Sequence, residues 1–148
     1  MILNKAIATV CGIGFLPKGG GSVAAAVYCI IWFLWPTMPL VVEIFSTLIV
    51  VVIGIYCADK VEILWGKDSS KVVIDEVAGM MIALLFVPFK WQYLVFAFVA
   101  FRFFDIVKPL GIRNLEKLPG GWGVMADDVL SGIYAWILLM GCIWFKIF

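Results

Sequence analysis

Five apolar runs, separated by short polar or proline- and glycine-containing stretches, make up most of this chain. They cover residues 23–35, 40–57, 74–87, 91–107 and 127–147, and a shorter apolar segment covers 2–16. Of the 148 residues, 65% are hydrophobic and the mean hydropathy is +1.13, whereas a typical soluble domain is about 45–50% apolar. Too few polar residues remain to cover a soluble core, so the pattern predicts a single integral membrane domain over residues 1–148.

The apolar runs predict helices rather than strands. A membrane barrel would place polar residues at every second position, but these runs are apolar on all sides. Helices satisfy their own backbone hydrogen bonds in lipid. We therefore expect an all-α polytopic membrane helix bundle with about four to five membrane helices plus a short N-terminal apolar segment. Because a spanning helix needs about 17–25 residues, the runs 23–35 and 74–87 are short.

Lysine and arginine residues are distributed unevenly between the two sides of this predicted bundle. Three lie between the second and third runs, three lie between the fourth and fifth, and Lys5 and Lys18 precede the first. The opposite side receives only Lys90 and Lys146. Cytoplasmic loops carry the excess of positive charge, so the charged side is predicted to be cytoplasmic. All acidic residues except Glu43 lie on that same side, which favours a site that opens to the cytoplasm.

Several kinds of chemistry are excluded by the residues that the chain lacks. The net charge of +1 and the absence of a basic tail give no indication of nucleic-acid binding. There is no histidine, which excludes a histidine nucleophile and zinc sites built on imidazole. The four cysteines have no metal-like spacing. For phosphate chemistry, the remaining route is a metal-activated water with a carboxylate base.

Two pairs of adjacent acids stand at the starts of apolar runs, where charged side chains are costly and default to functional candidates. Asp75 and Glu76 open the run 74–87, and Asp127 and Asp128 open the last run. A structural interpretation exists, because an acid at a helix start can act as an N-cap and suits the helix dipole. That interpretation explains one acid per helix better than two acids on each of two helices.

Small residues follow both acid pairs at four-residue steps. Gly79 and Ala83 follow the first acid of one pair, and Ser131 and Ala135 follow the first acid of the other. Small residues on one helix face let two helices approach closely. If these two faces meet, the acid pairs converge.

The stretch FRFFDIVKP places Arg102, Asp105 and Lys108 at three-residue steps on one helical face. Arg102 lies one turn deeper in the apolar run than Asp105, so it could offer its guanidinium fork to a phosphate while Asp105 holds it in place. The alternative is an Arg–Asp pair that only extends toward the membrane interface.

Four or five carboxylates that converge near a membrane surface would repel one another unless a cation joins them. All-oxygen ligands suit Mg²⁺, which typically keeps waters for a substrate phosphate. The loop PKGGGS adds Lys18 and free backbone N–H groups just before a helix that we expect Ser22 to cap. Such a helix start can hold a phosphate group.

Taken together, the motifs resemble the phosphatidylglycerophosphatase A family of small bacterial inner-membrane enzymes. The resemblance rests on GIGFLPKGGGS, VVIDEVAGM, FRFFDIVKPLGI and GGWGVMADDVLSG, which match the family in order and spacing over nearly the whole chain. The first motif departs from the usual P-x-A-P-G-T, because the chain has PKGGGS over residues 17–22. A hydroxyl group at the helix start is kept.

The resemblance implies a Mg²⁺-dependent lipid phosphatase that converts phosphatidylglycerophosphate to phosphatidylglycerol and inorganic phosphate. It implies a multi-pass protein of the bacterial inner membrane with its site on the cytoplasmic side, and it leaves the oligomeric state open. The implied metal ligands are Asp75, Glu76, Asp127 and Asp128, and the implied catalytic set adds Arg102 and Asp105. The implied phosphate-binding residues are Lys18, Gly20, Gly21, Ser22, Arg102 and Lys108. Asp59 is a further candidate.

Two alternatives use the same kinds of residue. A CDP-alcohol phosphotransferase also combines acids and a metal, but its D-G-x-x-A-R signature is absent. A small ion or metal transporter could use intramembrane carboxylates as a permeation path. Such a path needs polar groups through the far half of the bundle, where only Glu43 and Lys90 could serve.

Overall fold

The structure, a computed structural model, describes residues 1–148, and all of its regular elements are helices. The elements are α1 (Ile2–Ala8), the 3₁₀ turn η1 (Ile13–Phe15), α2 (Gly20–Leu34), α3 (Leu40–Trp65), α4 (Ile74–Ala83), α5 (Trp91–Val107), α6 (Ile112–Leu115) and α7 (Gly120–Trp144). The predicted all-α class is confirmed.

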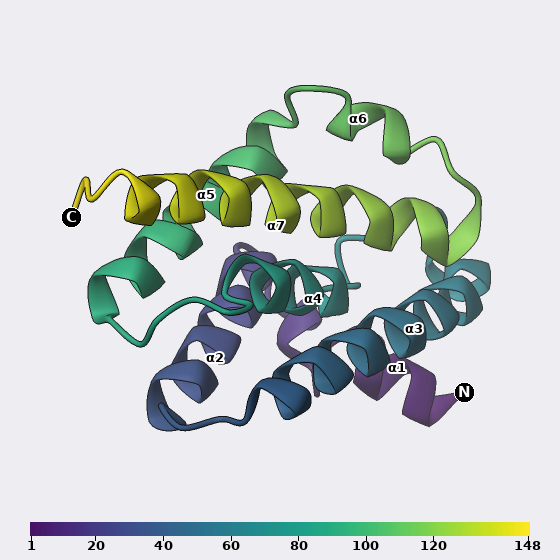
Figure 1. Cartoon of the computed structure of the whole chain (residues 1–148). Coiled ribbons are helices and arrows are strands. Elements are labelled where there is room, and N and C mark those ends of the chain that lie inside the picture. Colours follow the sequence, from purple (N-terminus) through teal and green to yellow (C-terminus); the bar gives the residue numbers. More distant parts are fainter.

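Helix α4 is short and lies in the middle of the molecule, between α7 on one side and α3 on the other (Figure 1). It also contacts α2 and α5, and six of its ten residues are buried. Its first turn carries Asp75 and Glu76. The central position of α4 therefore places one acid pair where four other helices can supply partners for it.

Proline and glycine residues set several of the helix ends. Helix α2 stops at Leu34, two residues before Pro36, and α3 begins directly after Pro39, since proline disfavours helical backbone at the residue before it but suits a helix start. Helix α3 ends at Trp65, and the next residue, Gly66, has a φ of 83°, which it can adopt because it lacks a Cβ.

Two helices extend further toward the charged side than we predicted. Helix α3 continues past residue 57 through the charged positions up to Trp65, and α7 begins at Gly120, before the start of the predicted run 127–147. Lysine and glutamate are good helix formers, so the polar composition of 58–65 does not end the helix. A Cβ at Gly121 would collide with the carbonyl group of Ile55, so this glycine lets the start of α7 pack directly against α3.

By length and apolar composition, α3 and α7 are able to cross a membrane. Helix α4 is about 15 Å long at 1.5 Å per residue, half of the roughly 30 Å hydrocarbon core, so it cannot cross alone. Large apolar side chains are exposed along the outer face of α3, among them Phe45, Ile49 and Val52, as expected for a surface that meets lipid. The predicted count of four to five membrane helices stays a prediction.

The buried side chains form two clusters on either side of α4. The larger one joins α2, α4, α5 and α7 through residues such as Trp32, Met80 and Phe101. The smaller one joins α1, α3, α4 and α7 through residues such as Val61 and Met125. Since both clusters include α4 and α7, packing on both sides fixes the relative position of the two acid-bearing helices.

Candidate active site

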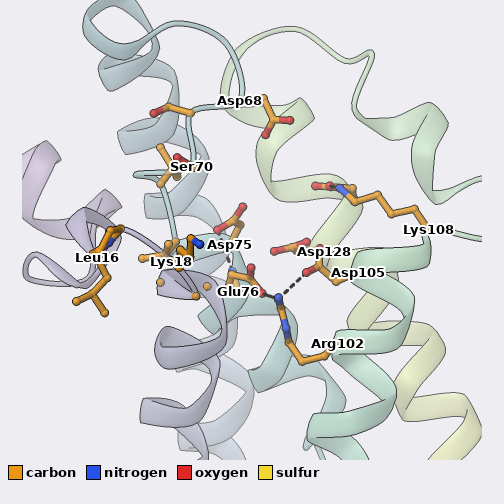
Figure 2. A pocket seen from close by; sticks show the side chains of 18 residues that line it. Leu16, Lys18, Asp68, Ser70, Asp75, Glu76, Arg102, Asp105, Lys108 and Asp128 are labelled. Atoms are coloured by element: carbon orange, nitrogen blue, oxygen red, sulfur yellow. Dashed lines mark hydrogen bonds and ion pairs between the residues drawn. The ribbon is translucent and has the colours of Figure 1, made fainter.

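A cavity of about 310 Å³ opens where the N-terminal ends of α2 and α4 meet the C-terminal end of α5 and the first half of α7 (Figure 2). Ten of the eleven predicted site residues line it, and only Ser22 does not. The full lining is Leu16, Pro17, Lys18, Gly19, Gly20, Gly21, Asp68, Ser69, Ser70, Val72, Val73, Asp75, Glu76, Arg102, Asp105, Lys108, Asp127 and Asp128.

The two acid pairs converge because α4 and α7 cross at glycines. A Cβ at Gly132 would collide with the backbone of Gly79, and a Cβ at Gly79 would collide with Phe101 and with the carbonyl oxygen of Asp128. Ser131, on the same face of α7, is fully buried and donates a hydrogen bond to the carbonyl oxygen of Asp127 at 2.8 Å. Helices α4 and α7 meet on faces that carry small residues, as expected, but the closest approach is at Gly132, which the sequence reasoning did not single out.

Three carboxylates, from Glu76, Asp105 and Asp128, lie close enough to share one cation. One oxygen from each lies within 4.8 Å of the others. We refer to these three residues as the carboxylate triad. Sequence reasoning chose both members of each acid pair as ligands, whereas the structure brings together one member of each pair with Asp105. Asp75 and Asp127 line the same cavity outside the triad.

Arg102 joins two members of the triad. Its Nη1 donates to Glu76 Oε2 at 2.5 Å and to Asp105 Oδ2 at 2.6 Å, and Figure 2 shows its side chain reaching up to both carboxylates from below. The predicted Arg102–Asp105 pair is present, with Glu76 as an additional partner. Both carboxylates keep a second oxygen that can be offered to a cation.

Lys108 has a different position from the one that the three-residue spacing predicted. It follows the end of α5 in a left-handed conformation with φ 52°, and its Nζ donates to Asp127 Oδ2 at 2.5 Å and to Glu116. Burial opposes its charge, but the hydrogen bonds to these two carboxylates outweigh burial and raise the pKa of the Lys108 ammonium group. Lys108 therefore stays protonated, with its charge directed to Asp127 and Glu116.

Two buried carboxylate oxygens have no hydrogen-bond partner in the protein, Oδ1 of Asp127 and Oδ2 of Asp128. Buried polar atoms normally find a partner, and an unpaired buried charge is costly. The cavity lining holds six carboxyl groups but only three cationic side chains, a formal excess of three negative charges when all are ionised. The unpaired oxygens, the excess charge and the all-oxygen donor set fit a hard divalent cation such as Mg²⁺.

The glycine-rich loop lies against the carboxylates. Helix α2 begins at Gly20, after Gly19 in a left-handed conformation with φ 74°, so Ser22 is the third residue of the helix. The prediction that Ser22 caps the helix is wrong, because the left-handed Gly19 starts the helix earlier. The backbone N–H groups of Gly20, Gly21 and Ser22 have no acceptor in the chain. A Cβ at Gly21 would collide with the carboxylate of Glu76, so a larger residue there would displace that carboxylate.

Sequence reasoning missed Asp68, Ser69 and Ser70, which line the cavity from the connection between α3 and α4. Their closeness in sequence to Asp75 was the available indication, since a short connection must return near the start of α4. The further candidate Asp59 lies elsewhere, in a separate pocket beside Trp122.

Comparison with known proteins identifies relatives over most of the chain. The family described as phosphatidylglycerophosphatase A matches residues 6–143. A Bacteroides thetaiotaomicron protein named "Putative phosphatidylinositol-3-phosphatase" is 44% identical, with 93% of this chain and 92% of that protein covered. The phosphatidylglycerophosphatase A of Haemophilus influenzae is 37% identical, with 83% of this chain and 76% of that protein covered. The phosphatidylglycerophosphatase A of Escherichia coli is 32% identical, with 80% of this chain and 69% of that protein covered. No solved structure matches the chain.

Proposed function

The chain belongs to the phosphatidylglycerophosphatase A family and is a phosphatase, and from this premise we propose that it is a Mg²⁺-dependent enzyme that hydrolyses the terminal phosphate of phosphatidylglycerophosphate. The products are phosphatidylglycerol and inorganic phosphate. The observation that carries this proposal is the carboxylate triad in a cavity with three excess negative charges. Such a cavity repels an anionic substrate unless a cation is present.

The residues that would hold the cation are Glu76, Asp105 and Asp128, because their oxygens lie within 4.8 Å of one another. When bound, Mg²⁺ supplies Lewis acidity to the phosphoryl group and lowers the pKa of a bound water. The unpaired Oδ2 of Asp128 gives the triad an oxygen that no protein group competes for.

Three groups are available to bind the substrate phosphate. Lys18 lines the cavity and takes part in none of the ion pairs of the chain. The free N–H groups of Gly20, Gly21 and Ser22 form the N-terminus of a 15-residue helix, which favours anions. Arg102 offers the donors that it does not use on Glu76 and Asp105.

Asp75 is the carboxylate best placed to act as the general base. Its only hydrogen bond is a local one, accepted from the backbone N–H of Glu76 at 2.9 Å, and it lines the cavity outside the triad. Asp127, by contrast, is bonded to Lys108. In the proposed reaction Asp75 takes a proton from the attacking water as the water oxygen bonds to phosphorus. The ester P–O bond then breaks, and the leaving alkoxide takes a proton from solvent at the cavity mouth.

We also propose a multi-pass arrangement in a bacterial inner membrane with the cavity on the cytoplasmic side. The apolar α3 and α7, the exposed apolar side chains of α3 and the excess of lysine and arginine on the side of the cavity support this arrangement.

The transporter alternative is less well supported. Below the triad, the crossing of α4 and α7 is filled by Met80, Phe101 and Ala135, all fully buried. Glu43 lies in a separate, mostly apolar pocket with Trp32 and Phe89. The buried cluster that contains Met80, Phe101 and Ala135 is apolar apart from the side chains of Tyr28, Trp32 and Tyr93, so it offers a permeating cation no carboxylate.

A direct test uses the purified full-length protein in detergent micelles with defined lipids. We expect Mg²⁺-dependent release of phosphate from phosphatidylglycerophosphate that is abolished by a chelator and restored by added Mg²⁺. The name of the Bacteroides relative gives phosphatidylinositol 3-phosphate as the second substrate to compare. Turnover that is independent of divalent cations would refute the metal assignment, and turnover of phosphatidylinositol 3-phosphate alone would refute the substrate assignment.

A further inference from the structure

One part of the cavity is not used by the proposed chemistry. Asp68, Ser69 and Ser70 line it from the connection between α3 and α4, and Figure 2 shows Asp68 and Ser70 at the edge of the cavity, at the opposite end from Arg102. A phosphate and a hydrated cation at the triad would leave this edge to another part of the substrate.

The polar groups at this edge are free to bind a ligand. Asp68 and Ser70 are exposed, and neither side chain forms a hydrogen bond or an ion pair within the chain. Ser69 differs from them, because its Oγ accepts the N–H of Lys71 at 3.4 Å. Asp68 and Ser70 therefore present one carboxylate and one hydroxyl group toward the cavity.

The backbone holds this edge in place. Lys71 packs against Gly14 so closely that a Cβ at Gly14 would collide with the Lys71 carbonyl group. Just beyond it, the N–H of Val73 donates to the carbonyl oxygen of Ala8 at 2.9 Å. Contacts with the N-terminal segment thus fix the connection directly after Ser70, so its polar groups need little ordering on binding.

The chemistry of the edge favours a hydroxyl group over a phosphate. A carboxylate repels phosphate but accepts a strong hydrogen bond from a hydroxyl group, and a serine hydroxyl both donates and accepts. Arg102, which attracts phosphate, lies at the opposite end of the cavity from Asp68 (Figure 2). The end of the cavity at Asp68 therefore suits a hydroxyl group better than a phosphate group.

We infer that Asp68 and Ser70 bind the hydroxylated part of the substrate head group and thereby set a preference for lipid phosphates whose phosphate is carried on a hydroxylated head group. Phosphatidylglycerophosphate has such a hydroxyl group between its two phosphates, and phosphatidic acid has none. This inference rests on the proposed phosphatase function and adds a specificity-determining role for two residues outside the catalytic set.

The test compares Asp68→Ala and Ser70→Ala, singly and together, with the wild type on phosphatidylglycerophosphate and on phosphatidic acid. Loss of a hydrogen bond to a charged group should lower kcat/KM for phosphatidylglycerophosphate roughly tenfold in Asp68→Ala, with kcat/KM for phosphatidic acid unchanged. Asp59→Ala is the matched control, because it removes an exposed acid outside this cavity. It should change neither value.

An inhibition measurement supplies a second readout. Glycerol 3-phosphate and inorganic phosphate should both inhibit the wild type, and Asp68→Ala should weaken inhibition by glycerol 3-phosphate only. Equal losses on both lipids, or no loss on either, would overturn the inference while leaving the phosphatase function intact. A wild type that hydrolyses neither lipid would overturn the phosphatase function itself, and the inference with it. If Asp68→Ala fails to fold, Asp68→Asn, which keeps an oxygen acceptor but removes the charge, should still lower kcat/KM for phosphatidylglycerophosphate by a smaller factor and leave phosphatidic acid unaffected, and equal effects on both lipids would overturn the inference.

Discussion

The acid pairs of α4 and α7 begin alike in sequence but have different surroundings in the structure. In each pair the second residue, Glu76 or Asp128, joins the triad. Glu76 is paired with Arg102, whereas Asp128 has an unpaired buried oxygen. The first residues differ more, because Asp75 is bonded only to a neighbouring backbone N–H group and Asp127 is bonded to Lys108.

Because their hydrogen-bond partners differ, we assign different proposed roles to these four carboxylates. A carboxylate without a cationic partner can accept a proton, and one with a protonated lysine is a poor base. Our proposal therefore has Asp75 as the base, Glu76 and Asp128 as ligands, and Asp127 as a residue that anchors Lys108. The predictions below test this division from the largest expected effect to the smallest.

Replacement of the base should have the largest effect. Asp75→Asn keeps the acceptor for the N–H of Glu76 but cannot take a proton from water. We expect kcat to fall about 1000-fold, with the Mg²⁺ concentration for half-maximal activity unchanged. Steady-state kinetics over a Mg²⁺ series measures both quantities. Near-normal kcat in this variant would assign the base to another residue.

Replacement of the ligand on α7 should have a smaller effect that depends on the cation. Asp128→Asn removes a charge from the triad, so we expect about 100-fold lower activity at fixed Mg²⁺ and partial recovery as Mg²⁺ is raised. Isothermal titration with Mg²⁺ should show weaker binding than in the wild type. An unchanged Mg²⁺ affinity would exclude Asp128 from the ligand set.

A change at the helix crossing should disturb both acid pairs together. The Cβ of Gly132→Ala would collide with the backbone of Gly79, which should lower the free energy of unfolding by about 1–3 kcal/mol. Thermal unfolding in detergent, followed by circular dichroism, measures the effect as a lower Tm.

Gly141→Ala is the matched control on the same helix, because a Cβ at Gly141 would meet no atom within 4 Å. In this position alanine should be neutral or stabilising by up to about 1 kcal/mol. Equal Tm values for the two variants would argue against close packing at the crossing.

Removal of the charge that anchors Lys108 should have the smallest effect. Asp127→Asn leaves Lys108 paired with Glu116, so we expect about a fivefold fall in kcat/KM. Glu116→Gln, at a more exposed carboxylate, should have a still smaller effect. A loss as large as that of Asp128→Asn, with the same recovery by Mg²⁺, would instead identify Asp127 as a ligand.

Local patterns in the sequence were sufficient to predict much of the site. The small residues after each acid pair predicted that α4 and α7 would meet, and the structure places Gly79 against Gly132. The three-residue spacing of Arg102 and Asp105 predicted their ion pair. Both predictions concern residues on a regular helix, where spacing alone defines the face.

The remaining features depend on backbone turns that spacing does not encode. Lys108 leaves the helical face of Arg102 because it adopts a left-handed conformation at the end of α5. Gly19 starts α2 ahead of Ser22 for a similar reason. The entry of Asp105 into the triad depends on how α5 packs against α4 and α7, which is a tertiary contact between distant segments.

The three excess negative charges of the cavity impose an order on ligand binding. Before a divalent cation is bound, the carboxylates repel the phosphate of the lipid, so the cation should bind first and the lipid second. Thermodynamic linkage then requires each ligand to strengthen the binding of the other by the same factor. The apparent affinity for the lipid should therefore rise with free Mg²⁺ until the cation site is saturated, and the lipid-bound enzyme should bind Mg²⁺ more tightly than the free enzyme.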